Sequence, residues 1–112
     1  MAPPTDIKVL SDLSILVRGA GRAGTAIARR LVGAGIPRVA LTELPSPRTP
    51  FLKTTFAGAL AQGEIDVEGL RGKKAEFHFE FVNIWADGMV PVFADPAAAV
   101  KGRVVPLVIV DA

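Results

Sequence analysis

Three glycines, Gly19, Gly21 and Gly24, stand between two segments with different apolar patterns. The short apolar run over 13–17 is typical of a buried parallel strand, and the apolar residues over 23–31 recur four apart, as on one side of a helix. The pattern therefore predicts a strand, a tight turn and a helix, which together form the first half of a mononucleotide-binding unit.

Each glycine has its own physical role in such a unit. Gly19 permits the sharp turn after the strand, Gly21 has no Cβ to keep a phosphate from the backbone, and Gly24 lets the helix approach the strand closely. The helix then begins with free N–H groups and the positive end of its dipole, which stabilise an anion. The turn predicted to cradle a phosphate consists of Gly19, Ala20, Gly21, Arg22, Ala23 and Gly24.

An acidic residue follows the second predicted strand of this unit. The helix is expected to stop near Gly35 and Pro37, and the apolar run over 39–41 leads to Glu43, which lies 19 residues beyond Gly24. An acid at about this spacing binds a ribose hydroxyl, and its charge would favour NAD over NADP by repelling a 2′-phosphate. The alternative is a strand–helix–strand unit whose glycines serve packing alone.

Two aspartates are further candidates for binding the ligand. Asp95 follows the apolar run over 90–94, and Asp111 follows the run over 107–110. Parallel strands end at the edge of the sheet where ligands bind, so both carboxylates are expected beside the glycine turn. Asp95 could equally cap a short helix that begins at Pro96.

Composition excludes several classes of function. The chain of 112 residues has no cysteine, no tyrosine and one histidine, His78, so no cysteine-based or clustered-histidine metal site is expected. Lys and Arg outnumber Asp and Glu by only 13 to 11, which gives no reason to expect nucleic acid or a membrane as a partner. No apolar run approaches the roughly 20 residues of a membrane span, so we expect a cytoplasmic protein.

The remaining segments predict an α/β protein. Helices are expected over 51–61 and 78–87, although the alternating Phe77, Phe79 and Phe81 also fit a strand. Further strands are expected over 65–67, 90–94 and 107–110, with the basic cluster over 71–74 in a solvated turn. The predicted fold is a three-layer Rossmann-like fold with a mostly parallel sheet of about four to five strands. Residues 1–112 are expected to form one domain, with 1–12 as an extended lead-in.

The chain also resembles the N-terminal half of the selenium-dependent molybdenum hydroxylase accessory proteins. This resemblance rests on the order of five stretches, of which TELPSP and the DVEG of the third are the most specific. The stretches are VRGAGRAGTAIARRLVGAGI at 17–36, TELPSP at 42–47, TFAGALAQGEIDVEG at 55–69, PVFADP at 91–96 and VIVDA at 108–112. The family usually carries Asp-Leu where this chain has Arg22 and Ala23.

The resemblance implies a role in maturing or supplying the cofactor of a molybdenum hydroxylase. The expected ligand is NAD(P) or another nucleotide, such as a molybdopterin nucleotide, and a molybdenum hydroxylase is a possible protein partner. The apolar strand that ends at Asp111 suggests either a chain cut at a domain boundary or coverage by a second subunit, and a homo-oligomer is expected. Two alternatives stay open at this point: an NAD(P)-dependent oxidoreductase domain, for which the chain lacks a catalytic constellation, and a non-catalytic oligomerisation domain.

Overall fold

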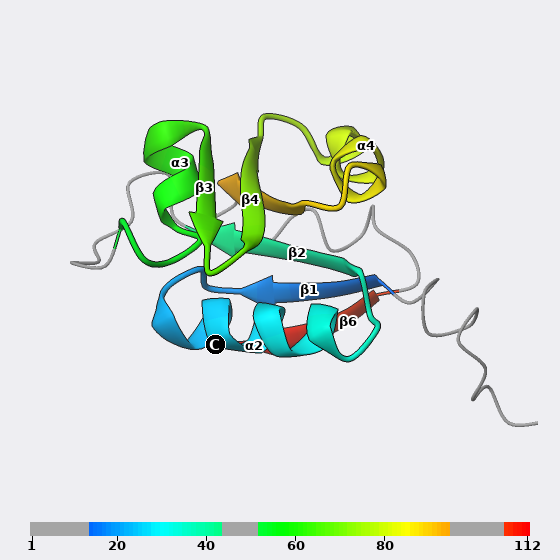
Figure 1. Cartoon of the computed structure of the whole chain (residues 1–112). Helices are drawn as coiled ribbons and strands as arrows, with labels where there is room; N and C mark the ends of the chain where they lie inside the picture. The colour runs from blue at the N-terminus through cyan, green and yellow to red at the C-terminus, as the bar shows by residue number, and fades with distance from the viewer. Residues whose placement is uncertain (1–13, 44–51, 95–106) are drawn as a thin grey trace, which may run out of the picture.

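A computed structural model describes residues 14–43, 52–94 and 107–112 of the chain, without the side chains of His78 and Leu107. The described strands form one six-stranded sheet in the order β3-β4-β5-β2-β1-β6. Figure 1 shows β1 and β2 in the middle of the molecule, with α2 alongside them. The predicted lead-in over 1–12, the predicted turn or helix over 96–100 and Asp95 lie outside the described residues.

The unit predicted around the three glycines forms the centre of the sheet. Strand β1 (Ser14–Arg18) leads through the glycine turn into helix α2 (Arg22–Gly33), and β2 (Arg38–Glu43) returns parallel to β1. Strand β6 (Leu107–Asp111) pairs in parallel with β1 on its other side. β1 and β2 are buried over most of their length because other strands and packed side chains enclose them, as their apolar runs predict.

The far half of the sheet contains an antiparallel pair. Strands β3 (Glu64–Val67) and β4 (Leu70–Ala75) form a hairpin, and β4 then pairs in parallel with β5 (Val90–Ala94). Glu68 and Gly69 make the two-residue turn with φ angles of 50° and 94°, and turns with two positive φ angles match the twist of paired strands.

The prediction of a three-layer Rossmann-like fold with a mostly parallel sheet of about four to five strands is wrong. The sheet is mixed and has six strands, because residues predicted as a basic turn over 71–74 belong to β4. Helix α3 (Gly58–Gln62) has five residues and α4 (Phe81–Ala86) has six. Among the described helices, α2 and α3 pack against one face of the sheet and only the six-residue α4 packs against the other, so the arrangement is not a clear three-layer one.

Two apolar clusters lie on opposite faces of the sheet, because alternate residues of a strand point to opposite faces. The larger cluster joins β1 and β2 to α2, α3 and the hairpin, and Phe56 is its largest fully buried side chain. The smaller cluster joins Leu16 and Ala40 to α4 through Phe81 and Ile84. The helix predicted over 78–87 is confirmed as a 3₁₀ turn, His78–Glu80, followed by α4.

None of the helices in the described parts of the chain combines the length and apolar character needed to cross a bilayer.

Candidate functional site

The glycine turn lies at the edge of the sheet where β1 and β2 both end. Gly19 has a φ of 111°, a value that side chains rarely adopt, and its N–H donates a hydrogen bond of 2.8 Å to the carbonyl of Thr42. The turn is therefore fixed to the last residues of β2 as well as to β1.

Gly24 brings helix α2 into direct contact with the turn. A Cβ at Gly24 would lie 1.7 Å from the carbonyl oxygen of Gly19 and 3.5 Å from the Cβ of Ala112. Only glycine fits this position without displacing backbone. The close approach expected of the third glycine is thus present.

Gly21, in contrast to Gly24, borders open space. It is the N-cap of α2, and a Cβ at this position would meet no atom of the described chain within 4 Å. The N–H groups of the first helical turn have no acceptor within the helix itself. The start of α2 therefore combines backbone donors that have no acceptor in the helix with the positive end of the helix dipole, next to the open space at Gly21.

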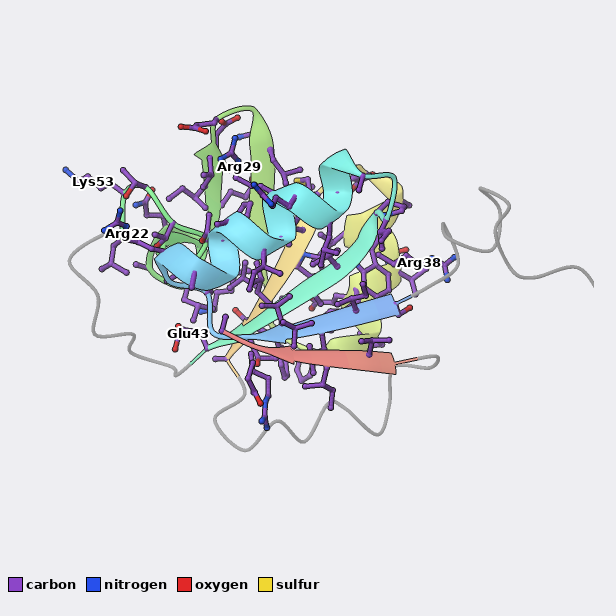
Figure 2. All side chains as sticks on the ribbon, turned by 90° about the horizontal axis from the view of Figure 1, so that it is seen from below. Arg22, Arg29, Arg38, Glu43 and Lys53 are labelled. Carbon is purple, nitrogen blue, oxygen red and sulfur yellow. The ribbon has the colours of Figure 1, made fainter. Side chains whose placement is uncertain are left out.

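Glu43 lies directly against the glycine turn. Its Oε1 accepts a hydrogen bond of 3.0 Å from the backbone N–H of Ala20, and the residue is partly buried. Figure 2 shows Glu43 at the end of β2, beside the beginning of α2. The structure therefore brings together the acid and the turn, which are 23 residues apart in the sequence. Because Glu43 occupies the amide of Ala20, an anion would bind to the amides that follow it.

Asp111 ends β6 beside β1, as predicted, but its carboxylate is engaged. Its Oδ1 accepts a hydrogen bond of 2.5 Å from Nε of Arg18 in an exposed ion pair. That hydrogen bond and the positive charge of Arg18 lower the pKa of Asp111, and the same bond and the negative charge of Asp111 raise the pKa of Arg18. Asp111 thus neutralises Arg18 at the edge of the site, while Asp95 lies outside the described residues.

Hydrogen bonds that the sequence pattern does not indicate support the glycine turn on its buried side. Oγ1 of Thr25 donates to the carbonyl of Ala20 at 3.2 Å and accepts from the N–H of Phe56 at 2.9 Å, and the N–H of Ala57 also donates to Ala20 at 2.9 Å. Buried threonine and backbone groups therefore fix the segment before α3 to the glycine turn. The position of Thr25 in the predicted helix gives no indication, from the sequence alone, that its side chain makes these hydrogen bonds.

The side chain of Arg22 lines a cavity on a different side of the helix start from Glu43. Figure 2 shows Arg22 close to Lys53, with Glu43 beyond the first turn of α2. No group of three or more His, Cys, Asp or Glu side chains in the described ranges is placed to hold a metal ion.

Comparison with known proteins finds one similar curated protein. The chain is 34% identical over 98 residues to the protein described as uncharacterized protein YqeB of Escherichia coli (strain K12). The match covers 88% of this chain but 18% of YqeB, so the chain spans less than a fifth of that protein's length. No family model and no solved structure matches the chain. Because YqeB is described only as uncharacterized, this similarity brings no activity to the chain.

Proposed function

We propose that the glycine turn and Glu43 bind a nucleotide-like ligand. The observation that supports this most is the hydrogen bond from the Ala20 N–H to the Glu43 carboxylate, together with the open space at Gly21. The hydrogen bond from Ala20 holds the carboxylate at the mouth of the turn, and a carboxylate has acceptor sites for more than one donor, such as a ligand hydroxyl group. A ligand with a phosphate and a sugar would therefore meet donors and an acceptor in the arrangement that it requires.

In this proposal the phosphate binds at the beginning of α2. The backbone N–H groups of Ala23 and Gly24 donate to its oxygens, and the helix dipole adds a favourable interaction of about 0.3–1 kcal/mol. Glu43 accepts from a sugar hydroxyl. Its negative charge disfavours a second phosphate at the same place, so NAD is expected to bind more tightly than NADP.

The biological setting is proposed from the sequence resemblance. We infer that the chain is the ligand-binding part of a cytoplasmic accessory protein that helps to mature or supply the cofactor of a molybdenum hydroxylase. Its ligand would then be NAD(P) or another nucleotide, such as a molybdopterin nucleotide. A molybdenum hydroxylase and a second copy of the chain are the proposed protein partners.

A calorimetric titration of the 112-residue chain with NAD, NADP, CTP and a molybdopterin nucleotide tests the proposal. We expect one of the four to bind saturably, and Gly21→Val to abolish that binding by filling the space for the phosphate. Gly33→Val is the matched control, because a Cβ at Gly33 also meets no described atom within 4 Å but lies at the other end of α2. A folded chain that binds none of the four, or that binds equally well with Gly21→Val, would overturn the proposal.

A further inference from the structure

A cavity of about 460 Å³ lies on the side of α2 that faces the β3–β4 hairpin. Three elements build it: the first two turns of α2, the segment before α3, and the hairpin turn. We call it the α2–hairpin cavity. Its lining residues are Arg22, Thr25, Ala26, Arg29, Lys53, Thr54, Thr55, Asp66, Val67 and Glu68. This volume is within the range of pockets that hold small molecules.

Positive charge dominates one end of the α2–hairpin cavity. Arg22 and Lys53 lie there, at the positive end of the α2 dipole. Lys53 makes no hydrogen bond or ion pair with any residue of the described ranges. An anion bound between these two side chains would gain charge-assisted hydrogen bonds from both of them.

The other end of the cavity carries two carboxylates that already have partners. Oε2 of Glu68 lies 2.6 Å from Nη2 of Arg29, so that pair is close to neutral. Oδ1 of Asp66, which lines the cavity, accepts from the N–H of Gly69 at 2.8 Å, and the carboxylate has capacity for a further donor. This end is therefore suited to hydroxyl donors rather than to a second anion.

Glu68 is held in a backbone conformation that its residue type disfavours. Its φ of 50° makes it the single non-glycine residue with positive φ in the described part of the chain. Asn or Gly is the usual choice at this position of a two-residue hairpin turn. The glutamate side chain, however, reaches Arg29 of α2 and forms the wall of the cavity, which neither smaller residue could do.

We propose that the α2–hairpin cavity is a second binding site, for a phosphorylated small molecule that carries hydroxyl groups, such as a sugar phosphate. Arg22 and Lys53 hold the phosphate, and Asp66 accepts a hydrogen bond from a hydroxyl group. The cavity differs from the proposed nucleotide site, because neither Glu43 nor Gly19, Ala20 or Gly21 lines it, although Arg22 at the start of α2 borders both.

Amide chemical shifts of the ¹⁵N-labelled 112-residue chain test this proposal. Inorganic phosphate and ribose 5-phosphate are titrated separately at constant ionic strength, with chloride as the balancing anion. We expect both to shift the amides of residues 53–55 and 66–68 saturably. Ribose 5-phosphate should bind more tightly, because its hydroxyls reach Asp66, and equal affinity for the two would contradict that contact.

Three variants, one of them a control outside the cavity, test the roles of individual side chains. Lys53→Gln should weaken phosphate binding about tenfold, because one charged donor is lost. Lys73→Gln, which changes an exposed lysine of β4 outside the cavity lining, should leave it unchanged. Glu68→Gln should strengthen binding, because it frees Arg29 from its ion pair without altering the backbone requirement of the turn.

The positions of the shifted amides also distinguish binding in the α2–hairpin cavity from binding at the proposed nucleotide site. Gly21→Val should leave the shifts at 53–55 and 66–68 intact, whatever it does to nucleotide binding. Shifts confined to 20–24, or full affinity in Lys53→Gln, would overturn the α2–hairpin cavity as a binding site.

Discussion

Replacing Gly24 with alanine should destabilise the protein strongly, although alanine is the better helix former. The new Cβ would lie 1.7 Å from the carbonyl oxygen of Gly19, so helix or turn must move by about 1.5–2 Å to reach an ordinary contact distance. The turn resists this movement, because Gly19 donates to Thr42 and Ala20 donates to Glu43.

The expected loss of unfolding free energy can be estimated from these contacts. Overpacking of this kind costs about 1–3 kcal/mol, and each turn hydrogen bond that breaks costs about 1 kcal/mol more. The higher helix propensity of alanine returns about 1 kcal/mol. We therefore expect Gly24→Ala to lower the free energy of unfolding by about 2–4 kcal/mol.

Gly33→Ala is the matched control in the same helix. A Cβ at Gly33 meets no described atom within 4 Å, and its φ is not positive, so this variant should gain about 0.5–1 kcal/mol. Urea unfolding followed by the fluorescence of Trp85 measures both, because its indole N–H donates to Val39 at 3.0 Å in the folded state. Equal or greater stability of Gly24→Ala relative to Gly33→Ala would refute the close approach of helix and turn.

Three further variants test other parts of the structure. Phe56→Ala should lower the free energy of unfolding by about 3–5 kcal/mol in the same urea assay, because its fully buried ring packs over Gly72, and a loss below 1 kcal/mol would contradict that packing. Asp111→Asn should be less stable than the wild type at pH 7, because a carboxyl with a lowered pKa stabilises the fold above its ordinary pKa of 3.8. The difference in melting temperature should disappear as the pH falls through the lowered pKa of Asp111, and a difference that persists there would argue against the pair with Arg18. Glu68→Asn should raise the melting temperature slightly, because relief of an unfavourable φ outweighs an exposed ion pair, and a clear fall would show that the ion pair dominates.

The central strands, helix α2 and the position of the acid could be predicted from the sequence. Their signals are local: an apolar run gives a buried strand, and the glycines mark the turn between Val17 and the helix. The meeting of Glu43 with Ala20 follows from parallel pairing of β1 and β2, which brings their carboxyl ends to one edge. Whether a ligand binds there stays a prediction.

Strand β4 could not be predicted in the same way. Its sequence, LRGKKA, has few apolar residues, and among its members only Gly72 and Ala75 are buried. The strand forms because its backbone pairs with both β3 and β5, whereas the lysine and arginine side chains extend to solvent. Such pairing is decided by tertiary contacts and not by the propensity of the segment.

Helix α3 is shorter than the pattern over 51–61 predicts, and here too the difference comes from tertiary contacts. A Cβ at Gly58 would lie 1.8 Å from the carbonyl oxygen of Leu52, so the preceding residues fold back onto the helix start instead of extending it. The contacts of Thr25 with Ala20 and Phe56 also require the folded chain, because they join segments distant in the sequence.

Amide chemical shifts on addition of the tightest-binding nucleotide test the proposed function most directly. The proposal predicts that the largest shifts fall on Gly21, Ala23 and Gly24, and that Glu43→Gln weakens binding while keeping an acceptor for Ala20. Shifts located away from this turn, or unchanged affinity in Glu43→Gln, would contradict it.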